Sequence, residues 1–143
     1  ETYFPSGINK KLETKIINFS EKIIKKLNYI GVLTIEFFID NNNRIYVNEL
    51  APRVHNSGHI TLNNAGTSQF EQHIRAVCGL SLVDLKNLNK GVMRNLIGKD
   101  IKSMSKISRE KRYKMYSKVK KYSYSKQEIK EGRKMGHINF VKS

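Results

Sequence analysis

The chain has 143 residues, of which 38% are hydrophobic, including six Phe and seven Tyr, so a packed core is expected and disorder throughout is not. No stretch approaches the roughly 20 consecutive apolar residues of a membrane helix, and the start at Glu1 lacks a signal-peptide pattern. Because no initiator Met is present, we expect the chain to begin inside a longer polypeptide.

The formal charge of +15 is unevenly distributed along the chain. Residues 1–98 hold 12 Lys/Arg against 8 Asp/Glu, whereas residues 99–143 hold 15 against 4. Such a basic segment could bind a phosphate backbone. However, Lys, Ile and Asn fill 50 of the 143 positions, and all three have A/T-rich codons. A biased base composition therefore explains the basic surface, and a nucleic-acid partner is not expected.

The single cysteine, Cys78, cannot form an internal disulfide, which fits a protein of the reducing cytoplasm. We interpret Cys78 as a small core residue on the face of a helix.

The chain begins with a predicted helix and a predicted hairpin. Residues 9–28 place apolar side chains at the spacing of one buried helix face. Strands are predicted over residues 30–39 and 44–50, joined by the polar turn Asp40–Asn43. If the loop between the strands holds an even number of residues, Glu36 and Glu49 lie on the same face of this hairpin. They are then within about one cross-strand residue pair of each other. Two carboxylates so placed could hold Mg²⁺ against nucleotide phosphates, although each could equally be a solvated strand residue.

A loop is predicted over residues 51–66, and it contains Arg53, His55, Asn56 and His59. These side chains suit an oxyanion, because a guanidinium can form paired hydrogen bonds and imidazoles and an amide can add further ones. Zinc is less suited, because no Cys and no paired-His helix spacing accompany them. Either His alone would more simply be a hydrogen-bonded structural residue.

The next helix is predicted to begin near Ser68, where Ser-Gln-Phe-Glu has the spacing of a capping box, and to stop at Gly79. Strands follow over residues 91–98, 119–125 and 136–141, with a Lys-rich connector between the first two. The basic loop before the last strand could clamp a monophosphate, or could be part of the general Lys excess. Its cations are Lys126, Arg133 and Lys134, and the imidazole of His137 accompanies them.

Five segments together resemble one family. Gly31–Phe38, Val47–His59, Thr67–Val77, Gly91–Leu96 and Gly132–Ile138 occur in the order seen in 5-(carboxyamino)imidazole ribonucleotide synthetase, an ATP-grasp ligase of purine biosynthesis. The resemblance implies an α/β (α+β) fold: the C-terminal portion of an ATP-grasp catalytic domain at residues 1–88, and a small β-rich domain at residues 89–143.

The resemblance also implies a reaction and a site. ATP phosphorylates bicarbonate, and the amine of 5-aminoimidazole ribonucleotide then captures the carboxyl carbon, leaving ADP and phosphate. The cofactors would be ATP and Mg²⁺, and the full-length enzyme would be a homodimer. The implied roles are metal binding by Glu36 and Glu49, ATP binding by Asn48 and Glu49, bicarbonate chemistry by Arg53, His55 and Asn56, and substrate phosphate binding by Lys126, Arg133 and Lys134.

Three alternatives remain at this stage. A formate-dependent glycinamide ribonucleotide transformylase is similar through the Glu-Phe and Pro-Arg elements, but it carries an Asp-Thr-Gly type sequence where this chain has Asn56–His59. A basic nucleic-acid-binding module would use tyrosines interleaved with cations over residues 109–126. A poorly folded gene remnant is the third. The parts of the family that cover the adenine are absent from the chain, so we predict no turnover by the chain alone.

Overall fold

The computed structural model describes residues 1–85 and 88–142. These residues form two compact units, one of residues 6–58 and 67–84, here called the ribbon unit, and one of residues 1–5, 59–66, 85 and 88–142, here called the sheet unit. The predicted domain boundary at residue 88 stays a prediction, and residues 86–87 beside it lie outside the described part of the chain.

The ribbon unit begins with helix α1 (Lys10–Lys26), as predicted. The Asn9 side chain caps it by accepting a hydrogen bond from the Leu12 backbone N–H at 2.9 Å. Lys25 and Lys26 in the last turn complement the helix dipole. Only part of the predicted buried face is covered, because Leu12 is buried whereas Phe19 and Leu27 are exposed.

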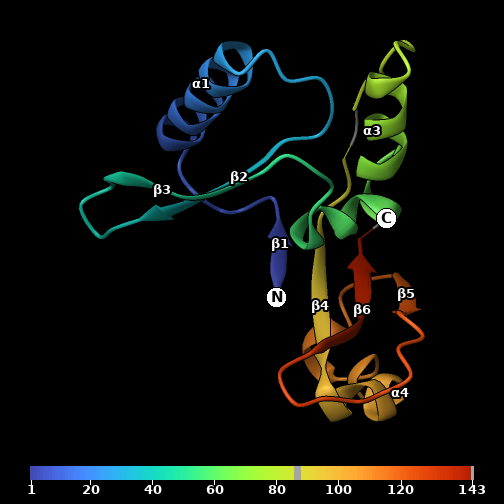
Figure 1. Ribbon diagram of the computed structural model, residues 1–143. Coiled ribbons are helices and arrows are strands. Elements are labelled where there is room, and N and C mark those ends of the chain that lie inside the picture. The colour runs from blue at the N-terminus through green and yellow to red at the C-terminus, as the bar shows by residue number, and fades with distance from the viewer. Residues whose placement is uncertain (86–87, 143) are drawn as a thin grey trace. The chain divides into compact units, whose positions relative to one another are not determined.

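Strands β2 (Thr34–Ile39) and β3 (Ile45–Ala51) form the predicted antiparallel hairpin, drawn in Figure 1 as a long two-stranded ribbon. Its turn is fixed by Asp40, whose Oδ1 accepts from the backbone N–H groups of Asn42 and Arg44, each at 2.9 Å. Asn43 adopts a left-handed φ of 58°.

Helix α3 (Gln69–Val77) completes the ribbon unit, and its predicted Ser68 cap is confirmed by a 3.2 Å hydrogen bond from the Glu71 backbone N–H. The interpretation of Cys78 as a core residue is wrong, since this residue is exposed just beyond the last helical turn. The apolar stripe of α3 is exposed as well, at Phe70, Ile74 and Val77.

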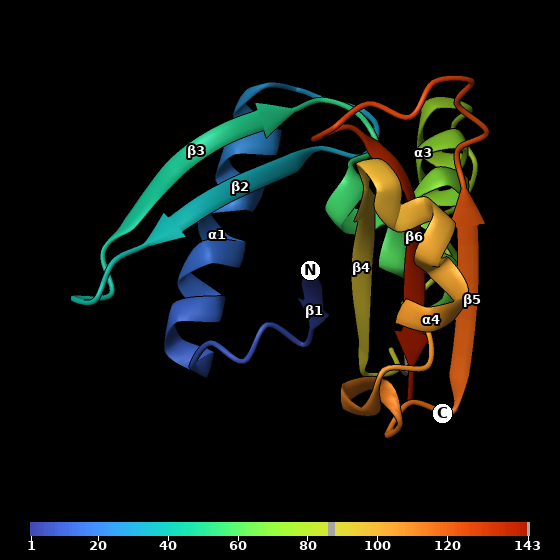
Figure 2. The same cartoon turned by 90° about the horizontal axis from the view of Figure 1, so that it is seen from below.

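The sheet unit contains a four-stranded antiparallel sheet in the order β1-β4-β6-β5. Figure 2 shows β6 between β4 and β5. The strands are β1 (Thr2–Phe4), β4 (Gly91–Ile97), β5 (Lys118–Ser123) and β6 (Lys134–Val141). Sequence analysis predicted the last three but not β1, which has only three residues and too short a pattern to detect.

The largest buried core of the described residues lies on one face of this sheet. Val92, Leu96, Ile138 and Phe140 project from the strands, and the ring of Tyr113 stacks on Phe140 with centroids 3.8 Å apart. The Lys-rich connector supplies the cover through short helices: η2 (Gly98–Ser103), α4 (Met104–Ile107) and η3 (Lys111–Tyr113). Most of the apolar residues of the connector therefore pack against the sheet, whereas Met115 is exposed.

The predicted loop at residues 51–66 is more ordered than expected, because it contains the 3₁₀ helix η1 (Asn56–Ile60) and the short helix α2 (Thr61–Asn64). Asn, Ser and Gly are poor helix formers, so composition alone argued for a loop. No helix among the described residues is long and apolar enough to cross a membrane.

Candidate functional site

The two carboxylates predicted to share a face of the hairpin are direct cross-strand partners, Glu36 opposite Glu49. Between Glu36 and Phe37 the register shifts, because Phe37 pairs with Val47 and leaves Asn48 as an extra residue on β3. Such bulges redirect side chains. Here the Asn48 amide donates a 3.2 Å hydrogen bond to Glu36 Oε2. The irregularity thus brings Asn48 and Glu36 together.

His55 completes this group from the loop that follows β3. Its Nε2 lies 3.5 Å from Glu36 Oε1 and 3.4 Å from Glu49 Oε1. The His55 side chain is 13% exposed, against 39% for Glu36 and 51% for Glu49. The imidazole therefore closes the inner side of a site whose carboxylates remain open to solvent.

The other ring nitrogen of His55 is also held. Nδ1 lies 2.9 Å from Ser57 Oγ and receives a longer contact, 3.4 Å, from the Ser57 backbone N–H. A hydroxyl can donate or accept, so Ser57 can serve either tautomer of the ring. The tautomer decides whether Nε2 offers a proton to the carboxylates or a lone pair to a cation.

The donor set of this cluster fits a divalent cation. One ligand atom from each of Glu36, Glu49 and His55 lies within 4.8 Å of the others, and no other such group of three occurs among residues 1–85 and 88–142. Two carboxylates directly opposite each other repel, and a cation would remove that cost. Carboxylate oxygens suit Mg²⁺ and Mn²⁺, and an imidazole nitrogen is acceptable to Mn²⁺.

The remaining residues predicted for the oxyanion are positioned differently. Arg53 is exposed, and its Nη1 donates to the Val54 carbonyl at 3.1 Å. Asn56 is the first residue of η1. Sequence analysis placed His55 with Arg53 and Asn56 because they are neighbours in the chain, whereas the structure brings His55 to the two carboxylates.

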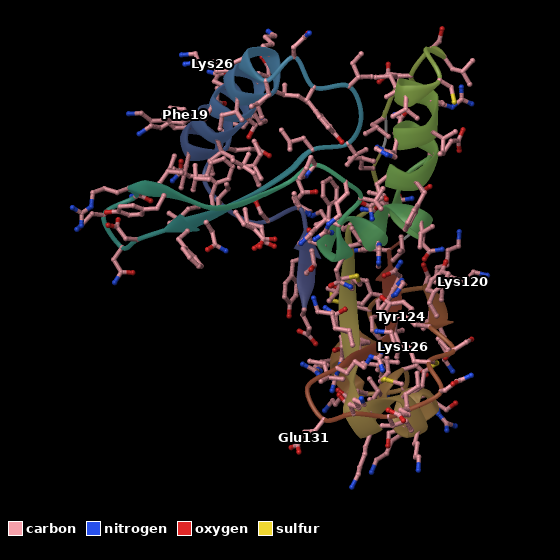
Figure 3. The ribbon with its side chains drawn as sticks, viewed as in Figure 1. Phe19, Lys26, Lys120, Tyr124, Lys126 and Glu131 are labelled. Atoms are coloured by element: carbon pink, nitrogen blue, oxygen red, sulfur yellow. The ribbon has the colours of Figure 1, made fainter. Side chains whose placement is uncertain are left out.

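Of the predicted phosphate-binding cations, Lys126 and Arg133 lie on the loop between β5 and β6 of the sheet unit, and Lys134 is the first residue of β6. Lys126 Nζ donates to the Lys134 carbonyl at 2.7 Å and lies 5.6 Å from the centre of the Tyr124 ring. Tyr124 and Lys126 are both labelled in Figure 3. Arg133 and Lys134 are exposed. The loop is closed at its base by a 2.9 Å hydrogen bond from the Tyr124 backbone N–H to the Met135 carbonyl. An anion could reach Arg133 and Lys134 directly, whereas Lys126 is held at the base of the loop.

His137, whose imidazole was predicted to accompany these cations in a monophosphate clamp, is buried instead. Its ring is 2% exposed, stacks on Tyr122 at 4.5 Å, and has Nδ1 2.9 Å from the hydroxyl of Tyr124. Burial, with a contribution from the neighbouring His59, lowers the pKa of His137 from 6.5 to about 4. The ring is therefore neutral at pH 7.

The tyrosines considered for nucleic-acid stacking are used within the sheet unit. Tyr113 is buried against Phe140, and Tyr116 packs against the same core. Tyr122 stacks on His137, and Tyr124 is hydrogen-bonded to it. Stacking platforms for bases need exposed aromatic faces. These rings instead contribute to packing of the sheet.

Comparison with known protein families agrees with this arrangement. Residues 1–70 match the ATP-grasp domain, and residues 91–143 match the phosphoribosylaminoimidazole carboxylase C-terminal domain. The chain is 44% identical over 142 residues to N5-carboxyaminoimidazole ribonucleotide synthase of Bacillus subtilis and 42% identical to that of Staphylococcus aureus. Over 99% of its length the chain is therefore similar to the N5-carboxyaminoimidazole ribonucleotide synthase family of ATP-grasp proteins. The predicted resemblance and the α/β fold class are thereby confirmed.

Solved structures of this family are similar over almost the whole chain. An ADP complex of N5-carboxyaminoimidazole ribonucleotide synthetase matches with a TM-score of 0.85 at 37% identity, covering 97% of this chain and 36% of that one. The Aspergillus clavatus enzyme in complex with ADP and 5-aminoimidazole ribonucleotide matches with a TM-score of 0.82 at 28% identity, covering 97% of this chain and 38% of that one. The curated relatives are matched over 99% of this chain but only 36% of their own length.

Proposed function

We propose that the chain is part of an enzyme that carboxylates 5-aminoimidazole ribonucleotide with bicarbonate and ATP in purine biosynthesis. The products would be 5-(carboxyamino)imidazole ribonucleotide, ADP and phosphate. The cluster of Glu36, Glu49 and His55 carries this proposal, because it supplies a cation site in a segment similar to the ATP-grasp domain. The similar enzyme of Aspergillus clavatus was solved in complex with both ADP and 5-aminoimidazole ribonucleotide.

The residues of the ribbon unit would act on the nucleotide. Glu36 and Glu49 would hold Mg²⁺, which when bound neutralises charge on the ATP phosphates. Asn48 donates to Glu36 Oε2 and so keeps this carboxylate oriented. Phosphoryl transfer to bicarbonate depends mainly on such positioning and on charge neutralisation. Arg53, His55 and Asn56 are proposed to surround bicarbonate and its phosphorylated form.

The cations of the loop in the sheet unit would bind the other substrate. Arg133 at the end of this loop and Lys134 at the start of β6 are exposed, and Lys126 is fixed at the base of the loop by the Lys134 carbonyl. A guanidinium and two ammonium groups suit the monophosphate of a ribonucleotide. The amine of that ribonucleotide would attack the carboxyl carbon as phosphate leaves. A cytoplasmic location and a homodimeric full-length enzyme belong to the same proposal.

A chimeric enzyme tests the proposed function. The 142 matched residues of this chain would replace the matching 36% of the Bacillus subtilis relative, which is 44% identical over this region. We expect ATP-dependent formation of the carboxylated ribonucleotide, measured as coupled ADP and product release. A Glu49→Ala chimera should lose at least about 100-fold in kcat, since it lacks a carboxylate of the cation site. A folded chimera that binds ATP but yields no product would contradict the proposal.

A further inference from the structure

The loop that carries His55 is held from one side by a single buried side chain. Gln69, the first residue of α3, is 8% exposed. Its Oε1 accepts a hydrogen bond from the His55 backbone N–H at 2.9 Å, and its Nε2 donates to the His55 carbonyl at 2.7 Å. Both backbone hydrogen-bonding groups of His55 are thus bound by one amide, 14 residues away in the chain.

The close approach of this amide depends on a glycine. A Cβ built at Gly58 would lie 2.3 Å from Gln69 Oε1 and 2.6 Å from its Cδ, far inside contact distance. The Gly58 backbone N–H also donates to the His55 carbonyl at 3.0 Å, which closes the turn over residues 55–58. Any larger residue at position 58 would displace Gln69 from His55.

The backbone and the ring of His55 are therefore held by two different residues. Gln69 holds the backbone, and Ser57 holds ring Nδ1 at 2.9 Å. With these points set, ring Nε2 is directed at Glu36 and Glu49, at 3.5 and 3.4 Å. We propose that Gln69 is a positioning residue of the candidate site, which holds the His55 imidazole against the two carboxylates in the space that Gly58 provides. This inference rests on the proposed function only in assigning a use to the cluster.

The same helix offers a matched control. Gln72 makes an equivalent pair of hydrogen bonds with Val83, donating from Nε2 to its carbonyl at 2.6 Å and accepting from its N–H at 3.1 Å. Val83 carries no ionisable group, so this second pair tests what the loss of such a clamp does to stability alone. Gln69→Met and Gln72→Met each remove one such pair of hydrogen bonds at similar side-chain volume. If Gln69 has a role specific to the site, only Gln69→Met should affect the His55 ring.

The first measurement needs no cation. In the 143-residue chain, Glu49→Gln should shift the NMR resonance of the His55 ring, because the carboxylate lies 3.4 Å from Nε2. In a Gln69→Met background we expect this shift to fall at least about threefold, and in a Gln72→Met background to remain. Exchange of the His55 amide hydrogen, expected to accelerate about tenfold in Gln69→Met, reports separately that the clamp has opened.

Three further variants keep the result interpretable if Gln69→Met folds poorly. Gln69→Glu retains the acceptor for the His55 N–H but has no donor for its carbonyl, so it should give an intermediate shift. Gly58→Ala should behave like Gln69→Met, because its Cβ would occupy the position of the amide. Gly66→Ala, with no atom within 4 Å of the added Cβ, is the control and should leave the shift unchanged.

Titration with Mn²⁺ then tests whether the cluster of Glu36, Glu49 and His55 binds a cation. Wild-type chain should bind Mn²⁺ and show paramagnetic broadening of the His55 ring, and Gln69→Met should weaken binding about 10- to 100-fold. An unchanged Glu49–His55 coupling in Gln69→Met, with its His55 amide in fast exchange, would overturn the role of Gln69. Loss of that coupling together with no Mn²⁺ binding by the wild type would support Gln69 as a positioning residue while overturning the cation in the proposed function.

Discussion

At the scale of single residues, the buried ring of His137 determines how the chain responds to acid. The imidazole is 2% exposed and lies between Tyr122, Tyr124 and His59, with no carboxylate among these ring neighbours. Protonation would place a charge in this environment, which is why the pKa falls to about 4. The unfolded chain, with a pKa of about 6.5, takes up the proton earlier.

His137 therefore predicts a loss of stability in mild acid. Between pH 6.5 and 4 the unfolded state binds more protons at this residue than the native state does, so the free energy of unfolding should fall as pH decreases. The loss from pH 7 to pH 5 should be about 2 kcal/mol. Urea unfolding at a series of pH values, with His137→Gln as comparison, measures it.

The pH range in which stability is lost distinguishes the effect of His137 from that of the carboxylic acids. The pKa values of Glu1, Asp40 and Glu71 lie below their ordinary values, so their contributions disappear only at still lower pH. A wild-type unfolding midpoint that stayed constant from pH 7 to pH 5 would contradict the prediction. An equal slope in wild type and His137→Gln would assign the effect to another group.

Sequence analysis found the residue types of the site more readily than their partners. Glu36 and Glu49 could be paired because strand alternation and the short turn set their faces. Gln69 could not be detected, since its role depends on a contact with His55 across 14 residues and a helix start. The extra residue Asn48 on β3 was also missed, because nothing in an alternating pattern of seven residues marks a bulge.

At the scale of elements, the ends of the helices are set locally, whereas the buried faces depend on their neighbours. The boundaries of α1 and α3 follow from their capping residues, Asn9 and Ser68, and both were predicted to within about two residues. The apolar faces of the same helices are only partly covered in the described chain. Apolar spacing for α1 and the capping box for α3 thus predicted where these helices form, but not how much of each face is buried.

Helix α1 gives a test of this local control. Asn9→Ala removes the acceptor for the Leu12 N–H and should lower the free energy of unfolding by about 1 kcal/mol. Asn18→Ala, the same change inside the exposed helix, should raise it by a few tenths of a kcal/mol, because Ala is the better helix former. Urea unfolding followed by circular dichroism measures both, and amide hydrogen exchange over residues 10–26 localises the change. Effects of the same sign in the two variants would contradict local control of α1.

At the scale of the whole molecule, charge and length determine what the chain can do alone. The net charge of +15 comes mainly from residues 99–143, where the connector also supplies buried cover for the sheet through Ile107 and Tyr113. The basic side chains surround that cover as solvated groups, and four tyrosines of the region pack within the sheet unit. The charge therefore follows from composition and does not by itself define a binding surface.

The 143-residue chain matches only part of the length of its relatives, and we predict that it has no turnover by itself. Its curated relatives are matched over 36% of their length, and a phosphoryl group in transfer needs charge-neutralising and positioning groups on all sides. The described residues provide one cation cluster and one basic loop, so water would reach a carboxyphosphate formed here. We expect the chain to bind Mn²⁺ but to release no ADP beyond the background of a Glu36→Gln, Glu49→Gln control, measured with 5-aminoimidazole ribonucleotide and bicarbonate present. ADP release coupled to product formation, and abolished in that control, would show that these residues suffice for catalysis.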